Sequence, residues 1–201
     1  ITNNAEFIGF DVIDEIKNSN NAAILFSAHL GNWELAPYST YIKGVPASTV
    51  YRKPNNLWVD GLVQKARGKA SSQNIAKGRE GARQILSLLK ANKYLGMLVD
   101  QKLDEGIAIP FFNQDAMTAD AIAVFALKLN CPLYPIRVMR ENKTKFKVIL
   151  YPKLEIENTG DKEKDVYNIL CQVNRNIEEW IKEKPEQWLW IHRRWDRSNY
   201  K

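Results

Sequence analysis

Short apolar runs that alternate with helical patterns constrain this chain more than any other feature of its sequence. Three of these runs have the length and composition of buried strands: residues 22–28, 48–52 and 94–99. Helical patterns lie between and after them, at residues 57–67, 78–92 and 161–183. This alternation predicts an α/β fold, with a central sheet flanked by helices and functional groups at the strand ends.

Two further segments complete the predicted elements. Residues 133–139 and 145–151 flank a polar turn, which predicts a hairpin and makes the sheet mixed. Thr118 is predicted to cap a helix that runs to Leu129. The length of 201 residues suits a single domain over residues 1–201.

Composition excludes several classes of protein. Hydrophobic residues make up 45% of the chain and charged residues 26%, which excludes disordered, collagen-like and disulfide-scaffold proteins. Cys131 and Cys171 lie among apolar neighbours, as buried thiols of a reducing compartment do. No signal peptide opens the sequence, and no apolar run reaches the roughly 18 residues of a transmembrane helix.

The positive charge of the chain is concentrated in one segment. The whole chain has 29 basic and 23 acidic residues, a net charge of +6. Residues 49–83 alone hold eight basic and two acidic residues, so this segment accounts for the whole excess. We expect an anionic partner to bind there, although a basic face in contact with solvent has the same composition.

The sharpest local motif is His29-Leu-Gly-Asn-Trp-Glu34, directly after the first predicted strand. Gly31 and Asn32 tolerate turn conformations, so Glu34 can fold back and hydrogen-bond the imidazole. A carboxylate on one imidazole nitrogen fixes the tautomer and makes the other nitrogen a better general base. A structural histidine beside a surface glutamate remains the alternative interpretation.

Other chemistries find little support in the sequence. A zinc site needs three or four ligands, whereas the second histidine, His192, is remote and lies among arginines and tryptophans. No serine or cysteine stands in a nucleophile motif, which disfavours a covalent acyl-enzyme. No glycine-rich phosphate loop is present, so no nucleotide cofactor, and no cofactor of any kind, is expected.

Six blocks in order resemble the bacterial lipid A late acyltransferases, the lauroyl and myristoyl transferases of the lysophospholipid acyltransferase superfamily, across residues 20–197. The blocks are His29–Glu34, Val50–Asn56, Lys65–Gly68, Val99–Gln101, Ile109–Phe112 with Ala116–Thr118, and Pro185–Trp195. The resemblance implies a glycerolipid acyltransferase-like fold. It also implies an O-acyltransferase of EC 2.3.1 type that moves a fatty acyl chain from acyl carrier protein to a hydroxyl of a lipid A precursor, without an acyl-enzyme.

The resemblance also assigns roles to individual residues. His29 and Glu34 would form the catalytic His-x4-Glu dyad, with His29 as general base. Arg67, and after it Arg52, would bind the acceptor or stabilise the oxyanion. Asp100 would belong to the active-site region, although a role in capping its loop is equally compatible with its position.

Aromatic residues are assigned by the same resemblance. Phe111 and Phe112 would shape the acyl groove or belong to the core. Asn113 stands where relatives have glycine, and asparagine still permits the positive φ of a turn. The C-terminal tryptophans suit either a membrane interface or packing on the core.

The expected setting is the cytoplasmic face of the bacterial inner membrane, with acyl carrier protein, the glycolipid and the membrane surface as partners and no nucleic acid. The chain begins only 28 residues before His29. Relatives carry a longer N-terminal part with a membrane-anchoring helix, which we expect to be absent from this chain. Alternatives are the same chemistry on a phosphatidylinositol mannoside, glycerolipid or ornithine lipid, a family member without activity, and a non-catalytic basic anion-binding module.

Overall fold

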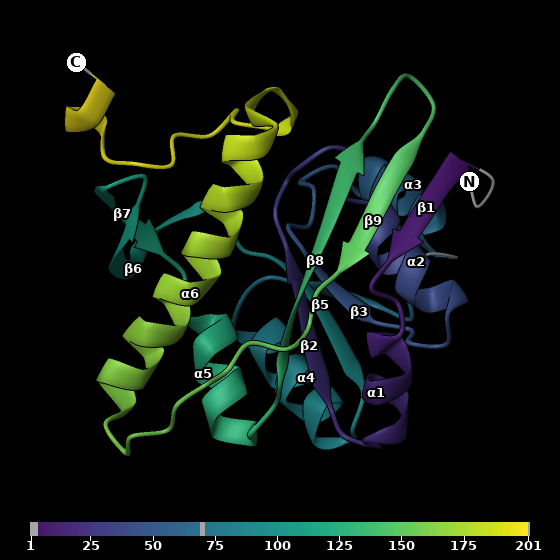
Figure 1. Ribbon diagram of the computed structural model, residues 1–201, viewed down its shortest axis with the longest axis horizontal. Coiled ribbons are helices and arrows are strands. Elements are labelled where there is room, and N and C mark those ends of the chain that lie inside the picture. Colours follow the sequence, from purple (N-terminus) through teal and green to yellow (C-terminus); the bar gives the residue numbers. More distant parts are fainter. Residues whose placement is uncertain (1–3, 69–70, 201) are drawn as a thin grey trace.

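A seven-stranded mixed sheet lies at the centre of the computed structural model, which describes residues 4–68 and 71–200 (Figure 1). The strand order is β1-β9-β8-β2-β5-β3-β4, and a separate hairpin pairs β6 with β7. In the sheet, β8 and β9 run antiparallel and the other described neighbours run parallel. The strands are β1 (Ala5–Ile8), β2 (Ala23–Ser27), β3 (Ser48–Tyr51), β4 (Asn74–Ala76), β5 (Tyr94–Leu98), β6 (Lys102–Phe111), β7 (Gln114–Thr118), β8 (Leu133–Arg140) and β9 (Phe146–Leu150).

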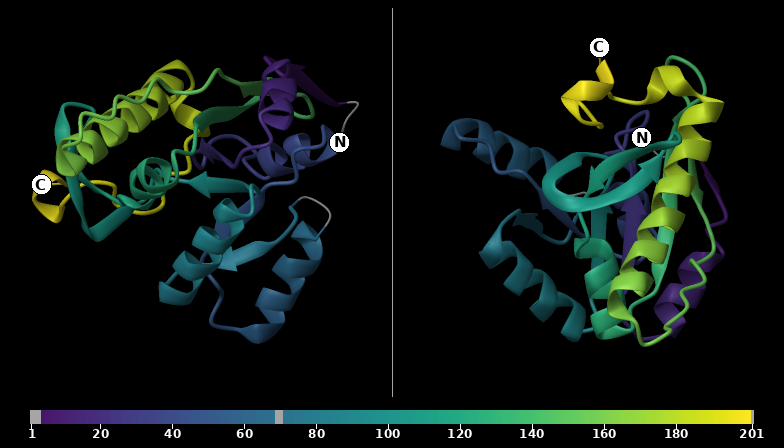
Figure 2. Two further views of the ribbon diagram at one scale, coloured as in Figure 1. Left: turned by 90° about the horizontal axis from the view of Figure 1, so that it is seen from below. Right: turned by 90° about the vertical axis from the view of Figure 1, so that its left-hand side faces the viewer.

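Helices cover both faces of the sheet, so the expected α/β class is confirmed (Figure 2). Helices α4, α5 and α6 bury their apolar sides against one face, and α1 and α2 pack on the other. The helices are α1 (Val12–Asn18), α2 (Leu35–Ile42), α3 (Leu57–Arg67), α4 (Arg79–Lys90), α5 (Ala121–Leu129) and α6 (Lys162–Glu183). Two short 3-10 turns follow, at Pro185–Gln187 and Arg197–Tyr200. None of the helices in the described ranges is both long and apolar enough to cross a bilayer.

Most of the expected elements are present, and the prediction for Thr118 is wrong. Thr118 ends β7, and α5 begins at Ala121. The hydroxyl of Thr118 donates to the carbonyl of Ala116 and accepts from the buried guanidinium of Arg194 at 2.7 Å. The side chain of Thr118 therefore ties the C-terminal segment to the hairpin.

The tight turn between β6 and β7 has the expected backbone. Phe112 and Asn113 both have positive φ, 51° and 60°, as the asparagine in place of glycine predicts. Phe111 has no exposed surface and packs edge-on against Trp188. It is therefore a core residue, one of the two roles that the sequence left open.

Two glycines in helices should respond in opposite ways to the same substitution. A Cβ on Gly81 in α4 would lie 1.9 Å from the carbonyl oxygen of Ala76, whereas Gly61 in α3 has nothing within 4 Å. We expect Gly81→Ala to destabilise the fold by about 1–3 kcal/mol through overpacking. Gly61→Ala should stabilise it by up to about 1 kcal/mol through helix propensity. Urea unfolding measures both, and a shift of the same sign in the two variants would contradict the described packing of α4.

Candidate active site

The imidazole of His29 is paired with Asp100, and the register of two neighbouring strands sets this pair. Strands β2 and β5 run parallel, with Ser27 opposite Leu98. His29 and Asp100 each follow that pair by two residues, so both lie at the same edge of the sheet. The Nδ1 atom of His29 lies 2.7 Å from Oδ1 of Asp100. The carboxylate can only accept, so Nδ1 carries the proton and Nε2 is left with a free lone pair.

Asp100 is buried, with 4% of its surface exposed, and is surrounded by donors. Its Oδ2 accepts from the backbone N–H of His29 at 3.1 Å and from Nε1 of Trp188 at 3.0 Å. Burial alone would raise the pKa of this carboxyl, but the hydrogen bonds from His29 and Trp188, together with the charge of the imidazole when it is protonated, outweigh burial and hold the pKa below its ordinary value. Asp100 is therefore ionised at neutral pH.

The C-terminal segment crosses the end of β2 and supplies one of these donors. The N–H of Leu189 donates to the carbonyl of His29 at 2.8 Å, and that of Gly31 donates to the carbonyl of Gln187 at 3.0 Å. The side-chain amide of Gln187 bonds both the N–H and the C=O of Arg140. The backbone on both sides of Trp188 is thus fixed, and its indole is held against Asp100.

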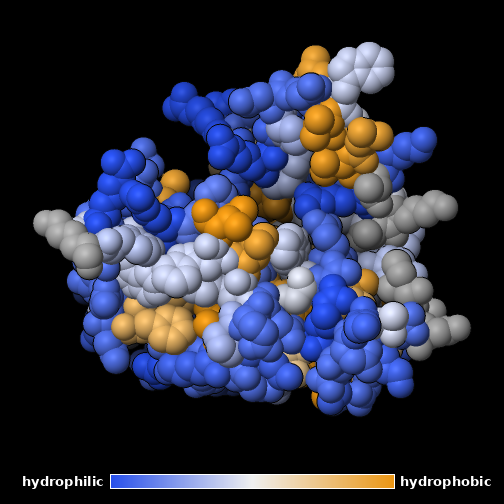
Figure 3. All heavy atoms as spheres, turned by 90° about the horizontal axis from the view of Figure 1, so that it is seen from above, coloured by the Kyte–Doolittle hydropathy of each residue, from blue (hydrophilic) through white to orange (hydrophobic). Residues whose placement is uncertain are grey.

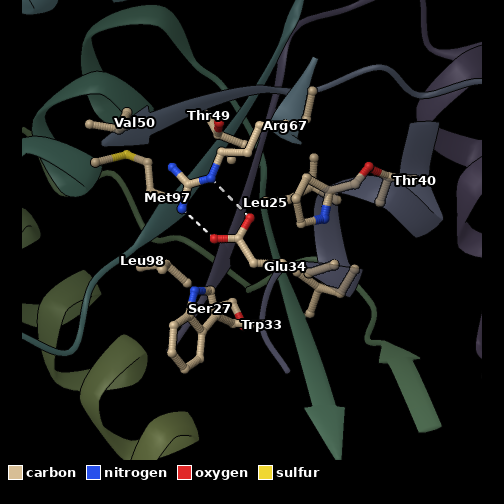
Figure 4. Close-up of a pocket in the computed structure, with 15 residues that line it drawn as sticks. Leu25, Ser27, Trp33, Glu34, Thr40, Thr49, Val50, Arg67, Met97 and Leu98 are labelled. Carbon is tan, nitrogen blue, oxygen red and sulfur yellow. Dashed lines mark hydrogen bonds and ion pairs between the residues drawn. The ribbon is translucent and has the colours of Figure 1, made fainter. Parts of the chain in front are cut away.

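The expected hydrogen bond between His29 and Glu34 is not the one that the structure contains. Glu34 is the N-cap residue of α2 and pairs with Arg67, the last residue of α3. The guanidinium donates to both carboxylate oxygens of Glu34, with Nε at 3.0 Å from Oε2 (Figure 4). The turn through Gly31, at φ 55°, directs the chain away from the imidazole. His29 therefore bonds to the carboxylate of Asp100, and Arg67 bonds to that of Glu34.

The Glu34–Arg67 pair lies at a mostly apolar pocket on the α2 side of the sheet (Figure 4). The pocket contains about 530 Å³ of empty space, including its open side. Its apolar lining includes Leu25, Ala36, Pro37, Val50, Met97, Leu98 and Ile136. Trp33 lines the pocket and also packs edge-on against His29, with ring centroids 5.0 Å apart. The pocket and the His29–Asp100 pair are therefore adjacent.

The structure brings four of the five predicted site residues together. His29 and Asp100 form one pair, Glu34 and Arg67 form the other, and Trp33 lies between them. Arg52, after β3, is exposed and does not belong to either pair. Trp188 is the contact that the sequence analysis missed. In the described part of the chain, no three His, Cys, Asp or Glu side chains converge as metal ligands.

The tautomer of His29 shows which carboxylate its ring is bonded to, Asp100 as in the structure or Glu34 as the sequence suggested. We expect Asp100→Asn to populate the wrong tautomer, because the amide no longer requires a proton on Nδ1. Glu34→Gln should leave the protonated nitrogen unchanged. Nitrogen-15 NMR of histidine-labelled protein measures this, with His192→Gln to assign the two rings. A change of tautomer in Glu34→Gln and none in Asp100→Asn would contradict the geometry.

Comparison with known proteins places this geometry in one family. The sequence model described as "Bacterial lipid A biosynthesis acyltransferase" matches residues 1–197. A lipid A biosynthesis palmitoleoyltransferase of Escherichia coli (strain K12) is 24% identical over 192 residues, which cover 92% of this chain and 60% of that protein. A lipid A biosynthesis acyltransferase of Haemophilus influenzae is 21% identical over 190 residues, covering 93% of this chain and 58% of the relative. The chain thus spans about three fifths of the length of these relatives, and it belongs to the bacterial lipid A biosynthesis acyltransferase family.

Proposed function

We propose that the chain transfers a fatty acyl group from acyl carrier protein to a hydroxyl of a lipid A precursor. Membership of the family supports this reaction class. The observation that carries the proposal is the imidazole of His29, whose Nδ1 is held by ionised Asp100 and whose ring packs against Trp33, a residue that lines the apolar pocket. We place the reaction at the cytoplasmic face of the inner membrane.

In this proposal, His29 is the general base. Its Nε2 takes the proton of the acceptor hydroxyl, and the oxygen attacks the thioester carbonyl of the donor. The tetrahedral intermediate then breaks its C–S bond, and the imidazolium returns the proton to the leaving thiolate. The acyl group passes directly to the acceptor, so no acyl-enzyme forms. Asp100 stabilises the imidazolium between these two proton transfers.

Glu34 and Arg67 have a separate role in the proposal. A guanidinium presents a fork of donors that suits a phosphate of the acceptor or the oxyanion of the intermediate. Glu34 accepts two of these donors and thereby fixes the plane of the group. Glu34 would therefore serve catalysis by positioning Arg67, and Arg52 would contribute positive charge at the rim. The His-x4-Glu motif then joins two functional units rather than one dyad.

Replacing the general base should abolish most turnover. His29→Ala is expected to reduce acyl transfer by about 10²–10⁴-fold, the usual contribution of a positioned base. The assay uses lauroyl- and myristoyl-acyl carrier protein with a tetra-acylated lipid A precursor in detergent. Glu34→Ala and Arg67→Ala should fall together, and their double variant should lose little more than either single variant, because the two residues act as a unit.

Each outcome of this assay bears on a separate statement. Equal product from wild type and His29→Ala would contradict the general base. Independent, additive losses in Glu34→Ala and Arg67→Ala would contradict their joint action. Transfer to a phosphatidylinositol mannoside, glycerolipid or ornithine lipid, with none to the lipid A precursor, would reassign the acceptor.

The pocket is the proposed site of the acyl chain. Gly96 in β5 lines it, and a Cβ there would meet only ordinary contacts, the nearest at 3.5 Å from Thr49. We expect Gly96→Val to shift donor preference toward shorter chains by about tenfold, since one or two methylene groups have that value in an apolar pocket. Competition between acyl carrier proteins of different chain length measures the shift. Gly61→Ala, outside the pocket, is the control, and an unchanged preference in Gly96→Val would exclude this pocket.

A further inference from the structure

Helix α3 is built with its polar side toward the protein. Asp60 accepts a hydrogen bond from the hydroxyl of Tyr51 at 3.1 Å. Gln64 donates to that same hydroxyl at 2.6 Å and accepts from the side chain of Asn74 at 2.8 Å. Arg67 makes the pair with Glu34 described above. Hydrogen bonds to β3 and β4, the ion pair with Glu34 and a looser ion pair between Asp60 and Lys53 at 3.9 Å, rather than apolar burial, therefore hold this helix.

The side of α3 turned away from these contacts is apolar and exposed at Trp58, Val59 and Leu62, and Leu57 in the first turn is exposed as well. The exposed fractions are 71% for Leu57, 87% for Trp58, 45% for Val59 and 68% for Leu62. Surface helices of globular proteins normally bury such a stripe. Leaving it exposed has a cost unless a partner covers it, so this face predicts an apolar partner.

The charges that surround this face are positive. Arg52, Lys53 and Lys65 are exposed at or near the helix, and of these Lys53 lies 3.9 Å from the carboxylate of Asp60. The acid of the helix, Asp60, points inward, and its side chain is only 15% exposed. The exposed face therefore combines Trp and Leu side chains with basic flanks, the composition of helices that lie in the headgroup region of anionic bilayers.

A second apolar point lies at the same edge of the molecule. Leu189, Trp190 and Ile191 have exposed fractions of 41%, 50% and 70%, next to the exposed Arg193. Both apolar points are attached to the candidate active site, α3 through Arg67 and the C-terminal segment through the bond from Leu189 to His29. Figure 3 views the molecule from above and shows clusters of hydrophobic side chains set among hydrophilic ones.

We propose that α3 docks on an anionic lipid bilayer through Leu57, Trp58, Val59 and Leu62, with residues 189–191 as a second contact. This arrangement would present the candidate active site, which lies between the two contacts, to a lipid acceptor held in the bilayer. The inference deepens the proposed function, on which its acceptor rests, by naming the surface that meets the membrane. A bilayer fits better than an acidic protein because it covers both apolar points at once.

Vesicle binding tests the proposal without any turnover. Wild type should co-sediment with vesicles of phosphatidylcholine and phosphatidylglycerol, and less with phosphatidylcholine alone or in 1 M NaCl. Trp58→Ala/Leu62→Ala should weaken binding by at least about tenfold, because two large apolar side chains no longer enter the interface. The matched control is Tyr41→Ala/Ile42→Ala, which removes two exposed apolar side chains at the far end of α2 and should bind like wild type.

Circular dichroism checks that all variants are folded. Brominated lipids should quench the fluorescence of the wild type, and the part of this quenching that disappears in Trp58→Phe reports insertion of that indole, while Trp190 in the second contact accounts for the rest. Binding of Trp58→Ala/Leu62→Ala within twofold of wild type would overturn the proposal. Wild-type binding that does not depend on phosphatidylglycerol would also overturn it. So would variants that no longer bind acyl carrier protein but still bind the vesicles. Failure of the proposed reaction is distinct, because it would leave vesicle binding by His29→Ala and wild type equally intact.

Discussion

The buried carboxylate of Asp100 determines how the candidate active site is put together. A charge in the interior is unfavourable unless donors surround it, and Asp100 receives three, from the ring and backbone of His29 and from Trp188. These donors have two structural origins. The ring and the backbone N–H of His29 are fixed by the pairing of β2 with β5, and the indole by the C-terminal segment. One buried charge thus connects the sheet to the end of the chain.

Much of the fold could be predicted from the sequence where the local signals were strong. Helix α3 has the expected bounds because the side chain of Asn56 caps its first turn and the apolar and polar residues follow a helical spacing. The hairpin of β8 and β9, the long helix α6 and the strands β2, β3 and β5 were also predicted. A helix beginning near Glu34 was also expected, and α2 begins there, whereas the prediction omitted β1, α1, β4 and the β6–β7 hairpin. Most of these are short, and β6 carries Asp104 and Glu105 within its span, which hides a strand pattern.

The candidate site was predicted in its residues but not in its contacts. His29, Glu34, Arg67 and Asp100 were all named, yet spacing along the chain suggested that the nearest acid, Glu34, serves the imidazole. The signal for the observed partner was present, because His29 and Asp100 each directly follow a predicted strand. Using that signal required the order of the strands, which only the folded sheet provides. Trp188 lies 88 positions from Asp100, and nothing local in the sequence connects the two.

The contribution of Trp188 also orders events during synthesis of the protein. His29 and Asp100 leave the ribosome before Trp188, which follows Asp100 by 88 positions. Until that residue is available, the carboxylate lacks one of its three donors and the carbonyl of His29 lacks its partner from Leu189. The hydrogen bonds around His29 and Asp100 are therefore incomplete in the nascent chain while the sheet is already being built. The set of hydrogen bonds around Asp100 is therefore completed only after helix α3 and all the strands of the sheet have been made.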